Sequence, residues 1–166
     1  MAAYNLIATT TVGSGGAATI VFSSIPQTFT DLKVVFSGRR SNDSNSLFVS
    51  FNGVTTNLSS RYLYGSGTAV ASGSDASNIF IYGINASSYT ASVFGSVDIY
   101  IPNYTSANYK SVSADGVSEN NASEGFQMLT AGLWSNTAAI TSLTISLSSG
   151  SIDQYSSASL YGIKNS

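Results

Sequence analysis

The sequence predicts an all-β fold, an antiparallel β-sandwich of two sheets with a jelly-roll-like arrangement. Apolar residues recur at every second position in short runs, which is the period of a half-buried strand. Clusters of Gly, Ser, Asn and Asp separate these runs, and those residue types favour turns. Helical spacing is not sustained over any stretch. So many short strands favour two packed sheets over a single one.

The alternation fixes which residues should face the core. The clearest inward-facing trios are Leu32, Val34 and Phe36; Leu47, Val49 and Phe51; Val97, Ile99 and Ile101; and Leu143, Ile145 and Leu147. We expect strands at 3–10, 17–23, 30–38, 46–52, 58–64, 78–83, 92–101, 107–114, 126–134, 139–147 and 156–163. All of them are assigned to one domain, 1–166.

Turn residues mark several boundaries between these strands. Asn52-Gly53 and Asp115-Gly116 each suit a tight turn that needs positive φ. Pro26 and Pro102 mark strand ends, where the missing N–H is harmless. The longest stretches without a strand pattern, 65–77 and 117–125, are predicted to be loops in which a partner would be met.

Composition excludes several classes of function. The chain has no His and no Cys, so it lacks the commonest catalytic bases, thiol nucleophiles and transition-metal ligands. Charged residues make up 8% of the chain and the net charge is −2, so no broad basic face exists for nucleic acid or anionic lipid. We therefore expect a non-enzymatic protein without a cofactor, a nucleic-acid partner or a membrane partner.

The N-terminal segment has neither the basic region nor the apolar run of a signal peptide. No apolar run reaches the length of a transmembrane helix. We expect synthesis in the cytoplasm.

Acidic residues offer two weaker hypotheses. Asp115, Glu119, Asn120, Asn121 and Glu124 supply the oxygen ligands that calcium prefers, although a solvated loop is the favoured interpretation. A glycosidase would need two paired carboxylates, for which Asp98 with Asp115, or Glu119 with Glu124, are the first choices. The pattern does not place either pair together, and we favour solvated acids.

Partner contacts are predicted at one pair of basic residues and at outward-facing tyrosines. Arg39 and Arg40 could anchor a neighbouring subunit, the alternative being simple exposure in a loop. Arg61 could pair with Asp98 across a sheet. The tyrosines assigned to a flat surface for sugars or protein are Tyr62, Tyr64, Tyr100 and Tyr104, with Tyr82 and Tyr109 as further members. The alternative is that these rings simply cover the sheet, because Tyr is a strong strand former. Trp134 is expected to be a core or rim anchor.

Four segments carry a resemblance to a known class of protein. They are FSSIPQTFTDL at 22–32, IYIPNY at 99–104, AGLWS at 131–135 and SLYGI at 159–163. With these segments the chain resembles virion structural proteins of tailed bacteriophages. The resemblance implies a sandwich or jelly-roll domain located in the virion, and often a homotrimer.

Two roles follow from this resemblance. The first is a capsid cement or decoration protein, whose partners are capsid or other virion proteins. An apparently complete domain without a coiled-coil stem favours this role. In it, residues 1–16 would act as a docking arm, and deletion of 1–12 would weaken particle association without unfolding the domain. The alternative is a tail or fibre tip module that binds a host receptor or glycan.

Overall fold

Every regular element of the described chain is a β-strand. The computed structural model describes residues 3–121 and 125–164. The strands are β1 (Ala3–Thr11), β2 (Thr19–Phe22), β3 (Asp31–Gly38), β4 (Ser46–Phe51), β5 (Leu58–Ser66), β6 (Ala69–Asp75), β7 (Ile79–Tyr82), β8 (Gly95–Ile101), β9 (Lys110–Glu119), β10 (Gly125–Trp134), β11 (Leu143–Ser146) and β12 (Ser157–Lys164). Within this part of the chain, no helix is long and apolar enough to cross a membrane.

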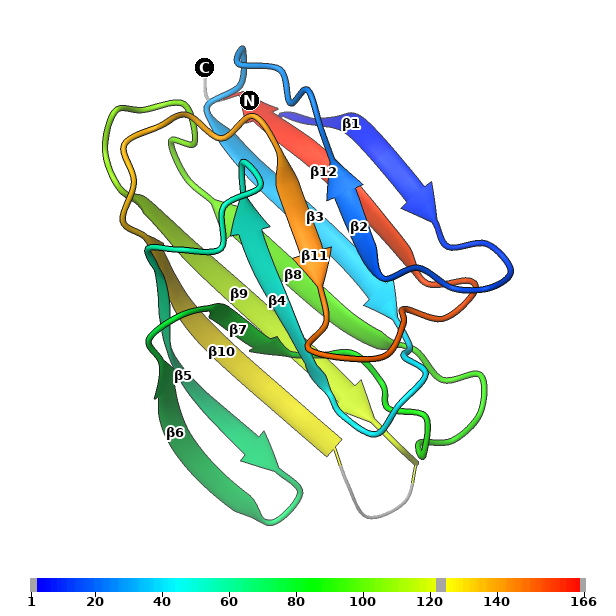
Figure 1. The fold of residues 1–166 in the computed structure, drawn as a ribbon. Helices are drawn as coiled ribbons and strands as arrows, with labels where there is room; N and C mark the ends of the chain where they lie inside the picture. The colour runs from blue at the N-terminus through cyan, green and yellow to red at the C-terminus, as the bar shows by residue number, and fades with distance from the viewer. Residues whose placement is uncertain (1–2, 122–124, 165–166) are drawn as a thin grey trace.

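The strands form two antiparallel sheets. The large sheet has eight strands in the order β1-β12-β3-β8-β9-β10-β5-β6, and the small sheet has four in the order β2-β11-β4-β7. Figure 1 shows the small sheet lying across one face of the large sheet, with β5 and β6 reaching past it. The predicted all-β, two-sheet sandwich is confirmed, with the strands divided unequally between the layers.

Alternating side chains from the two sheets fill the space between them. The predicted trios on β3, β4 and β8 are fully buried, as are Leu143 and Ile145 of β11, whereas Leu147 is only partly buried. Trp134 at the end of β10 is fully buried and packs against Phe51 of β4, with ring centroids 5.4 Å apart. Trp134 is therefore a core residue that joins the sheets.

Close backbone packing sets the position of β7 against β9. A Cβ added to Gly116 of β9 would lie 1.6 Å from the carbonyl oxygen of Tyr82. Only a residue without a side chain fits here. This approach fixes the lateral position of β7, and with it the residues that β7 presents to solvent.

Three of the predicted turns and loops differ from the structure. Asn52 and Gly53 both have positive φ and form the expected tight turn. Asp115-Gly116 is not a turn, because both residues lie inside β9 and pair with β8 and β10. The predicted loop 65–77 is largely strand, comprising the end of β5 and all of β6, whose small residues lack an alternating pattern. In 117–125, Val117–Glu119 belongs to β9 and Gly125 to β10, while 122–124 lie outside the described residues.

The N-terminal segment forms an edge of the large sheet. Among the described strands β1 pairs with β12 alone, with a register shift between Leu6 and Ala8. Val12 follows β1 and is buried in the core, exchanging backbone hydrogen bonds with the 155–156 segment. Deleting 1–12 would therefore remove a core side chain. A deletion meant to weaken particle association without disturbing the fold has to end before Val12. Docking of this segment stays a prediction.

Candidate functional site

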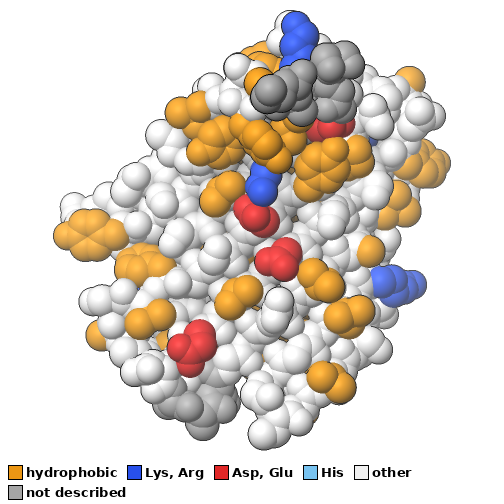
Figure 2. Space-filling view, turned by 180° about the vertical axis from the view of Figure 1, so that it is seen from behind, with side chains coloured by type: hydrophobic (Ala, Val, Ile, Leu, Met, Phe, Trp, Pro, Cys, Tyr) orange, Lys and Arg blue, Asp and Glu red, His pale blue; other side chains and the backbone are white. Residues whose placement is uncertain are grey.

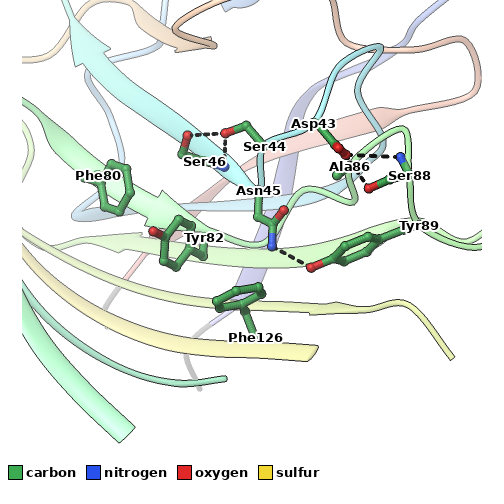
Figure 3. Close-up of a pocket in the computed structure, with 10 residues that line it drawn as sticks. All are labelled: Asp43, Ser44, Asn45, Ser46, Phe80, Tyr82, Ala86, Ser88, Tyr89 and Phe126. Atoms are coloured by element: carbon green, nitrogen blue, oxygen red, sulfur yellow. Dashed lines mark hydrogen bonds between the residues drawn. The ribbon is translucent and has the colours of Figure 1, made fainter. Parts of the chain in front are cut away.

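An open groove lies where β7 of the small sheet meets β10 of the large sheet. Its volume is about 480 Å³ (Figure 3). Its lining residues are Asp43, Ser44, Asn45, Ser46, Phe80, Tyr82, Ala86, Ser88, Tyr89 and Phe126. We call it the aromatic groove, because rings line one side of it and polar groups the other.

The ring-lined side is built by strand alternation. On β7, Ile79 and Ile81 enter the core, so Phe80 and Tyr82 point the other way and are half-buried. The ring centroids of Phe80 and Tyr82 are 4.9 Å apart, and those of Tyr82 and Phe126 are 5.1 Å apart. Tyr62 and Tyr64 of β5 extend the cluster beyond the groove through contacts with Phe80 and Tyr82. Burial raises the pKa of Tyr82, with smaller contributions from Tyr64 and Tyr62.

The polar side of the aromatic groove comes from two loops. Asn45 donates from Nδ2 to the hydroxyl of the buried Tyr89 at 2.7 Å. Asp43 accepts hydrogen bonds at Oδ1 from the backbone N–H and the hydroxyl of Ser88. In Figure 3 these groups face Tyr82 and Phe126 across the groove. These hydrogen bonds thus connect the loop that contains Asp43 and Asn45 to the loop that contains Ser88 and Tyr89.

Arg39 holds the second of these loops in place. Its guanidinium donates to the carbonyl oxygens of Thr90, Val93, Ser87 and Tyr89 at 2.9–3.3 Å. Its guanidinium therefore stabilises the loop at 87–93. Arg39 is only partly buried, so a partner contact at this residue stays a prediction.

The predicted partner contacts at Arg40 and Tyr104 are corrected, because both residues are fully buried. Arg40 donates to the carbonyl oxygens of Ser46 and Ser149 at 2.8 and 2.5 Å, and desolvation lowers the pKa of its guanidinium. Tyr104 lies in the core, where its hydroxyl donates to the carbonyl oxygen of Pro26. Neither side chain can reach a partner. The two-residue alternation of strands cannot predict that these side chains are buried, because residues outside strands do not alternate between a buried and an exposed side.

The other predicted tyrosines lie on opposite sides of the large sheet. Tyr62 and Tyr64 face the inner side and join the aromatic cluster. Tyr100 projects from the outer side of β8 and is 39% exposed. The predicted single flat surface of tyrosines is therefore not formed.

The outer side of the large sheet presents a broad, weakly charged surface, which we call the outer face. Figure 2 shows hydrophobic side chains scattered across it with few charges between them. The large hydrophobic residues exposed there are Tyr4, Leu6, Val35, Leu63, Val70, Tyr100, Val117, Leu129 and Leu133, with exposed fractions from 38% to 90%. They come from every strand of the large sheet except β12. Single scattered apolar residues are normal on a protein surface, so what distinguishes the outer face is that nine of the twelve large hydrophobic residues exposed in the described chain lie on it.

Charged residues on the outer face are placed differently from the predictions. Asp98 pairs with Lys33 at 3.1 Å. The predicted pairing with Arg61 is wrong, because two strands, β9 and β10, separate Asp98 on β8 from Arg61 on β5. Asp98 and Asp115 are register partners of β8 and β9, so the structure brings together one of the carboxylate pairs considered from sequence. Both lie on the outer face, which is a sheet surface and not a cleft.

The candidate calcium ligands, for which a solvated loop is the favoured interpretation, lie partly outside the described residues. Asp115 and Glu119 lie on β9, and Glu124 lies outside the described residues. Across residues 3–121 and 125–164, no cluster of three or more His, Cys, Asp or Glu side chains could hold a metal ion.

The residues that line the aromatic groove were largely missed from sequence. Asn45, Ser88 and Tyr89 lie in or beside loops, and Phe126 reads as an ordinary strand residue. The one available signal was Phe80 beside the Tyr82-Gly83 pair, on a short strand with aromatic residues in its outward phase.

Comparison with known proteins gives no relative: no family model, no curated protein and no solved structure matches this chain.

Proposed function

We propose that this chain is a virion structural protein, acting as a capsid cement or decoration protein that binds capsid subunits through the outer face. The single observation that carries the docking argument is that nine of the twelve large hydrophobic residues exposed in the described chain lie on that one sheet surface, with the charged residues Lys33, Asp98 and Asp115 between them. The resemblance of four sequence segments to phage virion proteins supports the location in a particle.

Physical chemistry favours assembly at this surface. Removing apolar area from water contributes roughly 25 cal/mol per Å², so exposed Leu63 and Leu129, which are cross-strand neighbours on β5 and β10, would stabilise a docked state. The low net charge of −2 means that little repulsion opposes packing many copies around a particle. Repeated weak contacts then add up to stable attachment.

The test uses purified virus particles from a host that carries this gene. Under the proposal, mass spectrometry finds the chain in the particles at a stoichiometry fixed by capsid symmetry. A density map then places it on the shell with the outer face against capsid subunits. Its absence from intact particles would reject the virion role. Attachment through the small sheet would reject the outer face as the docking surface.

A homotrimer is proposed as the assembled state. The number three comes from the resemblance to phage virion proteins; the two edge strands of the large sheet, β1 and β6, carry no Lys or Arg and no Pro, so they are open to pairing with another copy. Light scattering on the purified protein measures the mass directly, and a monomer at high concentration would contradict the trimer.

A tail or fibre tip module that binds a receptor glycan is the second candidate. The aromatic groove favours it, because rings beside amide and carboxylate groups are suited to sugars. A map that places the chain on the tail instead of the shell would select this candidate.

A further inference from the structure

We propose that the aromatic groove is a binding site for a neutral saccharide. This inference does not require the cement role, and it supplies the second candidate with a specific site. It depends on three properties of the groove: exposed rings, unengaged acceptor atoms with few charges, and a polar wall that is already held in position.

The ring-lined side suits the apolar face of a sugar. Phe80, Tyr82 and Phe126 are each half-buried, so their rings are partly open to solvent although they pack against one another. An aromatic face carries partial negative charge and attracts the weakly positive C–H groups of a pyranose ring. A solvent-exposed cluster of rings also carries a standing hydration cost that a stacked ligand relieves.

The polar side has hydrogen-bonding atoms left for hydroxyl groups. Among the described interactions the side chain of Asn45 uses only Nδ2, so its Oδ1 is left to accept, and the side chain of Asp43 uses only Oδ1, so its Oδ2 is left to accept. The hydroxyls of Ser44 and Ser46 bond to each other at 2.8 Å and lie at the same edge of the groove. Sugars present several hydroxyl donors close together, which matches this set of acceptors.

Charge selects a neutral ligand over an acidic one. The described lining residues include one carboxylate, that of Asp43, and no Lys or Arg. An acidic sugar would be repelled by Asp43 and would find no cation there to pair with. The volume of about 480 Å³ lies within the usual range of ligand pockets, roughly 300–1,000 Å³, and accommodates a short oligosaccharide.

The polar wall is held before any ligand arrives. Arg39 binds the carbonyl groups of the 87–93 loop, and Ser87 N–H donates to the carbonyl oxygen of Asn42 at 3.1 Å. Gly83 N–H donates to the carbonyl oxygen of Asn45, which ties the first loop to the end of β7. A pre-formed wall reduces the ordering cost of binding.

The experiment applies the full-length protein to an array of neutral and sialylated oligosaccharides. We expect binding to neutral members only. Chemical shifts of the Asn45 side-chain amide and of the Tyr82 and Phe126 rings should then change when the best array member is titrated. Phe126→Leu keeps an apolar side chain but removes the ring, and should weaken binding by about tenfold. Asn45→Ala should weaken it as well.

Tyr109→Leu is the matched control, because Tyr109 is 61% exposed and lies outside the groove. Tyr109→Leu should bind the saccharide as the unmodified protein does. The amide spectra of Tyr109→Leu and of Phe126→Leu should both keep the dispersion of the unmodified protein, as expected if both variants are folded. Three outcomes overturn the proposal: no binding to the array, preference for sialylated members, or shifts that map outside the groove. None of these outcomes bears on capsid attachment, so the cement role is tested separately.

Discussion

Tyr100 of β8 donates its hydroxyl hydrogen bond to Oδ2 of Asp31, a buried residue at the start of β3, at 2.7 Å. The other carboxylate oxygen, Oδ1, accepts from the backbone N–H of Asn103 at 2.9 Å. Asp31 thus links two neighbouring strands to the turn that follows β8. The same bond, together with burial and the Asp31 charge, raises the pKa of Tyr100 to about 12.

Tyr100→Phe should lower the free energy of unfolding at neutral pH by about 1.5 kcal/mol or more, the usual net contribution of a hydrogen bond to a charged group. The folded pKa lies above the ordinary value of 10.0, so the contribution is complete below pH 10 and is lost as the pH rises toward 12. The stability difference between the two proteins should therefore shrink over that interval. Urea unfolding of both proteins at a series of pH values measures it. A difference that grows with pH would show that the bond does not favour the protonated hydroxyl.

Gly116→Ala should destabilise the sandwich strongly. The new Cβ would lie 1.6 Å from the carbonyl oxygen of Tyr82, so β7 would have to move away from β9. Overpacking of this kind costs about 3 kcal/mol or more when backbone must shift. Gly13→Ala is the control, because no atom lies within 4 Å of its added Cβ, and it should stay within about 0.5 kcal/mol of the unmodified protein. Thermal unfolding of both variants measures this, and equal melting temperatures would contradict the packing argument.

Arg39→Met should loosen the 87–93 loop without unfolding the sandwich. The substitution removes the donors to four carbonyl groups. We expect the free energy of unfolding to fall by about 1–2 kcal/mol, because some of these carbonyl groups can accept hydrogen bonds from water instead. Amide exchange should become faster at Tyr89 and Val93, whose N–H groups bond within the loop. Arg61→Met is the control, since Arg61 is exposed and lies outside that loop. Unchanged exchange in Arg39→Met would show that the loop holds its own shape.

The strand alternation was enough to predict the layers of the fold, because strict two-residue patterns such as Leu32, Val34 and Phe36 have only one face that can be buried. The alternation failed at β6, where Ala69–Asp75 consists mostly of small residues and is exposed along most of its length. An edge strand with no buried face leaves no alternation to detect. Asp115-Gly116 failed for another reason: the Gly serves close packing against Tyr82 and not a turn.

The site was predicted far less well than the fold. The adjacent charges of Arg39 and Arg40 suggest a partner contact, yet backbone carbonyl groups from other segments accept hydrogen bonds from both guanidinium groups. Those acceptors come from residues as far away as Ser149, and no local pattern encodes them. The aromatic groove likewise joins Asn45, Tyr82 and Phe126 from separate parts of the chain, so only the tertiary structure brings its two sides together.

Shortening the chain at the N-terminus should separate the role of β1 from that of the core. Removing residues 1–9 deletes most of an edge strand that pairs with β12 and keeps Val12 in place. We expect the shortened protein to fold and to associate more weakly with particles. Removing 1–12 should in addition lower the melting temperature, because the buried Val12 is lost. Full association of the 1–9 deletion with particles would rule out a docking role for β1.

Leu129→Lys should weaken attachment to particles by at least about tenfold while leaving the fold intact. Leu129 is 50% exposed near the middle of the outer face, and its cross-strand neighbour Asp115 can accept the new charge without strain. Burying that Lys against a capsid subunit would carry a desolvation cost of about 2 kcal/mol or more, which shifts binding by at least about tenfold. Val21→Lys is the matched control, because Val21 is 53% exposed on β2 of the small sheet, away from the outer face. Sedimentation of each variant with particles stripped of the native protein measures attachment. Equal attachment of both variants would exclude the outer face, and loss only in Val21→Lys would assign docking to the small sheet.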